Sequence, residues 1–166
     1  YFAELDSNNN VIRVITAPED IISSPNDTAG ETWCSNNISN DPDISLVDGV
    51  YPGVAWKQTY KNAFDAVTRW NYAGIGGTYD PTNDVFINGQ LFASYTLNEQ
   101  FKWQCPVAYP TTDDLGNTLP RDAFYPDNLL INWNENLLKW IGQRVVDGVQ
   151  ITKTWDPNTS TWSIKE

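Results

Sequence analysis

A short pattern recurs along this chain: an apolar residue, an Asp or Asn, a polar turn, and a second apolar residue seven positions after the first. It is clearest in "WDPNTSTW", where Trp155 and Trp162 enclose six polar residues. Asp followed by Pro suits the first two positions of a type I turn. A four-residue turn over residues 157–160 sets the two tryptophans opposite each other on one face of a β-hairpin. The pattern therefore favours antiparallel hairpins.

Four further copies fit the same spacing. The copies are Tyr79 to Phe86, Trp133 to Trp140, Leu5 to Ile12 with aliphatic ends and, one residue shorter, Leu97 to Trp103. An internal repeat of this kind predicts one hairpin for each copy. A cross-strand aromatic pair contributes roughly 0.2–1 kcal/mol to a sheet, so the paired rings have a sufficient structural reason to exist.

Composition points to the same fold class. Aromatic residues make up 13% of the 166 residues, with eight Trp, and they supply core material in a chain otherwise rich in turn-forming residues. We expect a mainly β fold of antiparallel hairpins, arranged as a sandwich or meander, with one short helix. The helix is predicted near residues 29–36, because Thr28 and Glu31 have the spacing of a capping box.

Other segments give strand and turn signals of differing strength. Residues 2–5 and 11–16 predict an N-terminal hairpin, "VAWKQTYKN" a strand, and "SYTLNEQFKWQ" a second hairpin. The dipeptide Asn88-Gly89 is the strongest short hairpin signal, and Asp147-Gly148 predicts another turn. The stretch "AFDAVTRWNYAGIGG" supports helix and strand equally.

These signals divide the chain into three parts. Residues 1–110 are predicted to form a β domain with the N-terminal hairpin and the short helix. Residues 111–128 belong to a stretch with four prolines and no periodicity, which we interpret as a Pro-rich loop or linker. Residues 129–166 are predicted to form a C-terminal module of β-hairpins.

Charge narrows the range of partners. The net charge is −11 and the isoelectric point is near 4.2, with ten Lys and Arg scattered along the chain. Such a surface is repelled by phosphate backbones and by anionic lipid, so we expect neither a nucleic-acid partner nor a membrane partner. No apolar run approaches the roughly 20 residues that span a bilayer.

The sequence also lacks much of the usual catalytic chemistry. It has no His, which excludes Ser-His-Asp and Cys-His catalysis, and its two Cys cannot build a zinc site. A hydrolase with two carboxylates remains an alternative, but most of the glutamates lie in predicted turns, a cap or the chain end, where solvation explains them. The glycines at 74, 76 and 77 do not match a dinucleotide fingerprint. We expect a protein that is not an enzyme and has no cofactor.

Two acidic turns and two cysteines leave alternatives open. The stretch "DPDISLVDG" (Asp41, Asp43, Ser45, Asp48) and the stretch "DSNNN" (Asp6, Asn8, Asn10) offer oxygen ligands for Ca²⁺, although neither has the Gly and Glu positions of an EF-hand. Turn formation is the favoured interpretation of both. Cys34 and Cys105 form either one disulfide bridge or, as we favour, two buried thiols.

Two stretches resemble a known protein family. "NYAGIGGTYDPTNDVFI" and "SYTLNEQFKWQCPVAYP" are similar to segments of small virion-associated proteins of marine tailed phages, the cyanophage type, and so are residues 1–16 and, loosely, the final hairpin. Residues 111–145 fall outside the resemblance. It implies a phage origin and a place in the virion, and it implies no catalytic residue.

We therefore expect a structural protein that decorates a capsid or attaches to a tail, and that docks on the main particle proteins through β edges and aromatic anchors. We also expect a homo-oligomer. The alternative is a glycan-binding β module that uses exposed tryptophans. Its candidate contacts, which serve equally as partner contacts in the first hypothesis, are Trp133, Trp140, Trp155 and Trp162. Solvent-facing coplanar rings favour glycan binding, and buried rings favour a structural role.

Overall fold

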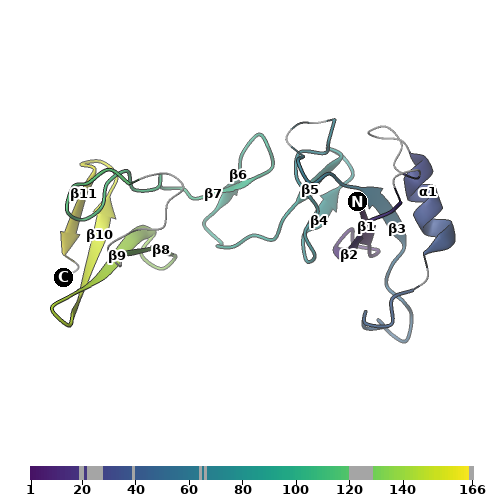
Figure 1. The fold of residues 1–166 in the computed structure, drawn as a ribbon, viewed down its shortest axis with the longest axis horizontal. Coiled ribbons are helices and arrows are strands. Elements are labelled where there is room, and N and C mark those ends of the chain that lie inside the picture. The colour runs from purple at the N-terminus through teal and green to yellow at the C-terminus, as the bar shows by residue number, and fades with distance from the viewer. Residues whose placement is uncertain are drawn as a thin grey trace. The chain divides into compact units, whose positions relative to one another are not determined.

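A computed structural model describes residues 1–18, 21, 28–38, 40–63, 65, 67–119 and 129–164 (Figure 1). The chain is mainly β, with antiparallel sheets and one helix among these residues, as expected. It divides into two compact units: residues 1–91 with 97–103, and residues 92–96 with 104–166. The expected domain boundaries at residues 110 and 128 stay predictions.

The first unit is built on a three-stranded sheet. Its strands are β1 (Phe2–Leu5), β2 (Val11–Ile15) and β3 (Ala55–Gln58), in the order β2-β1-β3. The predicted N-terminal hairpin and the strand in "VAWKQTYKN" are thus confirmed. One detail is wrong: Leu5 pairs with Val11 and not with Ile12, because the register shifts between Glu4 and Leu5. Strand β1 pairs along both of its edges, so the N-terminal segment is not available for adding itself to another sheet.

The helix packs beside this sheet. It is α1 (Thr28–Asn37), which confirms the predicted helix and lies along β3 (Figure 1). A Cβ built on Gly30 would lie 2.4 Å from the ring of Phe2, so the helix approaches β1 at a position where any larger residue would collide. Phe2, Cys34 and Trp56 belong to the apolar cluster that forms there.

Two glutamates lie inside this unit, where solvated side chains were expected. The carboxylate of Glu31 does not cap the helix. It accepts a hydrogen bond from the amide of Gln58 at 3.0 Å and forms ion pairs with Arg69 at 2.8 Å and Lys57 at 3.1 Å. Glu4 is also buried and pairs with Arg13 at 2.8 Å. The expectation was wrong because opposite charges on neighbouring elements satisfy both carboxylates away from water.

The rest of the first unit contains a short two-stranded sheet. Strands β4 (Thr78–Asp80) and β5 (Val85–Ile87) place Tyr79 opposite Phe86, as the repeat predicts, and both rings are buried. The hairpin predicted at Asn88-Gly89 is wrong, since β5 ends at Ile87 and no strand follows directly. The chain there instead passes close to Gly74 and Gly77, and the carbonyl of Asn88 accepts from the indole of Trp103 at 2.6 Å.

Two other sequence predictions have simple outcomes. Strands β6 (Thr96–Leu97) and β7 (Trp103–Gln104) confirm the hairpin in "SYTLNEQFKWQ". Within residues 63–77, the described positions form turns and bends, so neither of the two alternatives for this stretch is realised.

The second unit contains a four-stranded sheet. Its strands are β8 (Leu130–Asn134), β9 (Lys139–Val146), β10 (Val149–Asp156) and β11 (Thr161–Ile164). They neighbour one another in chain order, which makes a meander. Trp133 pairs with Trp140 and Trp155 with Trp162, so both aromatic pairs of the repeat are confirmed, as is the turn at Asp147-Gly148.

The copies of the repeat share a turn conformation as well as a sequence pattern. The residue just before the second strand has a positive φ in three of them: 53° at Asp84, 51° at Leu138 and 53° at Ser160. In both Asp-Pro copies the Asp carboxylate accepts the amide two residues later, from Thr82 at 2.8 Å and from Asn158 at 2.9 Å. The short polar side chain therefore fixes the turn that sets the rings opposite each other.

Both cysteines are free thiols, so the alternative of a disulfide bridge is wrong. The favoured prediction of two buried thiols is confirmed for Cys34 but not for Cys105, which is partly exposed. Burial raises the pKa of Cys34 to about 11. No helix in the described part of the chain is long and apolar enough to cross a membrane.

Candidate functional site

All four tryptophans singled out in the sequence lie on one face of the second unit's sheet. Trp133 stands opposite Trp140 with ring centroids 5.3 Å apart, and Trp155 stands opposite Trp162 at 5.4 Å. Side chains alternate between faces along a strand, and the register of β9 with β10 puts both pairs on the same side. We call this side the tryptophan face.

Residues 107–114 of the same unit lie against this face. The indole N–H of Trp140 donates to the carbonyl of Val107 at 3.0 Å, and the indole N–H of Trp162 donates to the carbonyl of Thr112 at 2.8 Å. The ring of Tyr109 meets Trp140 edge to face, with centroids 4.9 Å apart. This segment therefore uses backbone carbonyls to hold indoles that a flat binding platform would leave free.

One ring of each pair is more deeply buried than its partner. Trp155 is 3% exposed and Trp133 is 7% exposed. The indole N–H of Trp133 donates to Glu135 Oε2 at 2.8 Å, and Glu135 also accepts from the amide and hydroxyl of Ser94 at 2.7 and 2.8 Å. The hydrogen bond from Trp133 lowers the pKa of Glu135, so this carboxylate is a weak proton acceptor at neutral pH.

Position 142 explains how Trp162 reaches across the sheet. A Cβ built on Gly142 of β9 would lie 2.8 Å from Cζ3 of Trp162, although β10 runs between β9 and β11. The indole thus spans the width of β10 and rests on the backbone of β9. A flat ring in contact with backbone on one side and hydrogen-bonded at its nitrogen has little freedom to reorient around a ligand.

A cluster of charges accompanies the rings on the tryptophan face. Arg144 Nη2 lies 2.6 Å from Asp114 Oδ1, and Lys153 Nζ lies 3.2 Å from Asp114 Oδ2. The Arg144 contact has the distance of an ion pair without hydrogen-bond geometry, since neither atom has a hydrogen-bond partner among the described residues. Both oxygens of Asp114 therefore lie against cations.

Asp113 is held by the turn that follows it. Its carboxylate accepts from the amides of Leu115 at 2.9 Å and Asn117 at 2.7 Å, and from the side chain of Asn117 at 2.9 Å. Burial raises the pKa of Asp113, but the hydrogen bonds from Asn117 and Leu115 outweigh it and hold the pKa below its ordinary value. The group stays ionised and acts as a structural acceptor.

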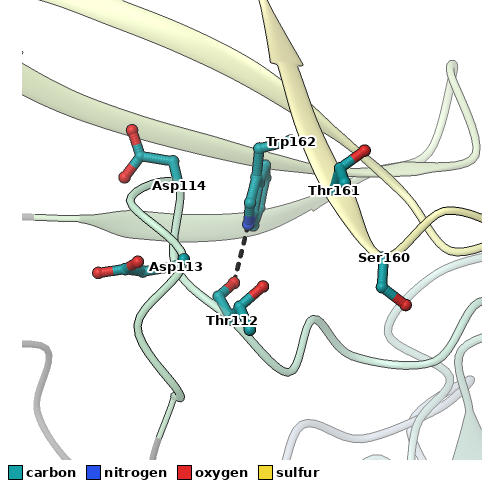
Figure 2. A pocket seen from close by; sticks show the side chains of 7 residues that line it. Thr112, Asp113, Asp114, Ser160, Thr161 and Trp162 are labelled. Carbon is teal, nitrogen blue, oxygen red and sulfur yellow. Dashed lines mark hydrogen bonds between the residues drawn. The ribbon is translucent and has the colours of Figure 1, made fainter.

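One hollow opens beside Trp162, with a volume of about 230 Å³. Figure 2 shows the indole nitrogen directed at Thr112, with Ser160 and Thr161 on the opposite side of the ring from the two aspartates. Hydroxyl groups beside an indole ring suit a small polar ligand such as a sugar. The residues that line this Trp162 hollow are Thr112, Asp113, Asp114, Gly116, Ser160, Thr161 and Trp162.

The two acidic turns considered for Ca²⁺ fold as ordinary turns. Asp6 accepts from the amides of Asn8 and Asn10, both at 2.8 Å, and Asp41 accepts from the amide of Asp43 at 3.0 Å. Asp41 also faces Arg13 at 3.4 Å. Across the residues with described positions, no group of three acidic, Cys or His side chains is arranged to hold a metal.

No family model, curated protein or solved structure matches the chain. The resemblance to phage proteins consequently stays a prediction.

One feature of the fold escaped the sequence analysis. Residues 46–50, which overlap a stretch expected to be an acidic turn, form a tight hairpin in which Val47 and Val50 exchange two backbone hydrogen bonds of 2.9 Å. The signal was present in the sequence, because the tetrapeptide V-D-G-V occurs at 47–50 and again at 146–149.

Proposed function

We propose that this chain is a structural protein of a tailed-phage virion and not an enzyme. It decorates the capsid or attaches to the tail, and it docks on the main particle proteins. The proposal is supported by the tryptophan face, whose rings serve the protein's own packing, and by the absence of His from the sequence. The carboxylates nearest the rings are held by cations or by amide groups.

The docking part of the proposal rests on the two outer edges of the second unit's sheet. Strands β8 and β11 are outermost, and no described strand pairs along their outer sides. An exposed strand edge presents unpaired N–H and C=O groups, which a strand of another chain can satisfy. In the first unit, β2 and β3 are the outer strands, and β1 is enclosed between them.

Cosedimentation tests this proposal. The purified chain is mixed with separated heads and separated tails of a tailed phage, and the amount retained after centrifugation is measured. We expect saturable retention on one of the two fractions. Retention on neither fraction contradicts the proposal. The control is the chain centrifuged alone, which reports aggregation.

The Trp162 hollow favours a second candidate function, glycan binding. An indole ring with neighbouring hydroxyls at Thr112, Ser160 and Thr161 offers both stacking and hydrogen bonding. A glycan array tests it with two kinds of variant. Trp162→Ala removes the ring, whereas Ser160→Ala with Thr161→Val removes hydroxyls and leaves the ring in place. Glycan binding that both variants abolish, in folded protein, supports this candidate over docking, and an array without signal eliminates it.

A further inference from the structure

Two hairpin tips, one in each unit, share both sequence and backbone geometry. The turn at Asp48-Gly49 has φ values of 51° and 77°, and the turn at Asp147-Gly148 has φ values of 50° and 78°. In both, valines flank the turn and pair with each other: Val47 with Val50, and Val146 with Val149. Two successive positive φ values identify the two-residue turn that suits a tight hairpin.

The tips also share an unusual exposure of aliphatic side chains. Each tip carries three of them, and the six are between 42% and 66% exposed. They make up a third of the 18 large apolar side chains that are exposed in the described part of the chain. We name residues 46–50 and 145–149 the two apolar fingers. Their exposed side chains are Leu46, Val47, Val50, Val145, Val146 and Val149.

Turn formation explains part of this pattern and leaves the rest unexplained. Asp-Gly is favoured because both central residues need a positive φ. The turn itself does not require exposed valines beside it. The tip between β8 and β9 also carries exposed aliphatic side chains, Leu137 at 43% and Leu138 at 50%, but two other hairpin tips are polar. The tip between β1 and β2 is "DSNNN", and the tip between β10 and β11 is "PNTS". Repeated exposed aliphatics at a protruding turn are typical of side chains that become buried against a partner.

Charge selects the kind of partner. The finger at 46–50 contains Asp48 and has Asp43 nearby, and residues 40–56 contain no Lys or Arg, although Asp41 is paired with Arg13 at 3.4 Å. A second copy of a chain with net charge −11 meets repulsion at such a surface. A pocket with an apolar floor and a rim of Lys or Arg complements both the valines and the turn aspartates.

We propose that the two apolar fingers insert into the same kind of pocket, apolar with a basic rim, on two copies of one partner protein. This inference rests on the proposed virion function, because a particle lattice presents the same surface many times. Two like fingers on one chain then bind with an effective concentration that a single finger lacks. The fingers add apolar side-chain contacts to the backbone hydrogen bonds that the strand edges can form with the partner.

Paired substitutions at the fingers test the inference in the full chain. Val47→Thr with Val50→Thr alters the first finger, and Val146→Thr with Val149→Thr alters the second. Threonine keeps the branched shape and the strand preference of valine while removing apolar surface. Ile75→Thr is the matched control, since Ile75 is at 74% even more exposed than the finger side chains but lies outside both fingers. The probe is the fraction, heads or tails, that retains the unaltered chain.

Charge is tested separately. Asp48→Asn with Asp147→Asn removes both turn charges and keeps the turn, because Asn-Gly favours the same conformation. We expect weaker retention that depends less on salt concentration, because the variant has lost its charge contacts with the basic rim and salt screens such contacts.

The expected results for the valine variants are specific. Altering one finger lowers affinity about 100-fold, altering both removes detectable retention, and Ile75→Thr changes nothing. If the unaltered chain is retained and the double-finger variant is retained equally, the finger inference is wrong while the virion function stands. If the unaltered chain is not retained at all, both fall. Sedimentation velocity of the chain alone provides one more test. If the unaltered chain self-associates and the double-finger variant does not, the fingers bind a second copy of the chain, and the inference is wrong.

Discussion

Gly142 lies directly under the indole of Trp162, so close that a Cβ at position 142 would be 2.8 Å from Cζ3 of the ring. The contact joins β9 to β11 across the strand between them. It explains why β9, an inner strand of a Trp-rich sheet, carries a glycine, which on propensity alone weakens a strand.

Gly142→Ala is therefore expected to destabilise the second unit. The added methyl group must displace a ring that is held at its nitrogen by Thr112, and overpacking of this kind costs about 1–3 kcal/mol. Urea unfolding followed by tryptophan fluorescence measures the change. Gly89→Ala is the control, because a Cβ at position 89 has no neighbour closer than 3.9 Å. Equal stability of the two variants contradicts the packing described for Trp162.

The Trp155–Trp162 pair is expected to show coupling in a double-mutant cycle. Trp155→Leu, Trp162→Leu and the double variant are compared with the unaltered chain by urea unfolding. A tilted aromatic pair adds about 0.5–1.5 kcal/mol beyond the area it buries. Trp155→Leu should cost more than Trp162→Leu, because Trp155 is the more deeply buried ring. A coupling energy near zero shows that the rings contribute independently, and it contradicts the stabilising role given to the cross-strand pair.

Glu31→Gln is expected to destabilise the first unit strongly. The Arg69 guanidinium is buried with Glu31 and the carbonyl of Gln58 as partners, and removing one charge of a buried pair costs about 3–5 kcal/mol. Thermal unfolding by circular dichroism provides the measurement. Asp84→Asn also touches Arg69 but at a side chain that is 44% exposed, so its effect should be far smaller. A larger effect at Asp84 than at Glu31 would refute this assignment.

Asp113 predicts a pH dependence with a definite sign. Its pKa in the folded chain is below that of the unfolded chain, which is near 3.9 for Asp, so it contributes stability that is fully present above about pH 5. That contribution is lost as the pH falls below about 4 and through the folded-state pKa. The stability difference between the unaltered chain and Asp113→Asn should consequently shrink over this window. A difference that is constant from pH 7 to pH 3 is incompatible with the lowered pKa.

Local sequence patterns predicted most of the hairpins, and the reason is physical. Each hairpin is specified within about ten residues by a turn motif and by the two side chains that face each other across it, as for Trp133 with Trp140. The failure at Asn88-Gly89 shows the limit of such patterns. A good turn dipeptide forms no hairpin when its neighbours are engaged elsewhere, here with Gly77 and Trp103.

Long-range contacts decided what the patterns could not predict. Glu31 had the spacing of a helix cap, yet its partners Gln58 and Arg69 are 27 and 38 residues away in the sequence. Nothing local marks such a partner. Likewise, tryptophans at fixed spacing are compatible with either an open platform or a covered face. The segment that covers them, residues 107–114, shows no periodicity that would predict its position.

Quantitative mass spectrometry of purified particles tests the central claim most directly. Particles of a tailed phage that carries the gene are purified by density gradient, and the copy number of this chain is measured against that of the major capsid protein. The account predicts a fixed copy number that survives repeated purification and high salt. A chain that is absent from the particles, or present in amounts that fall with each purification step, contradicts it.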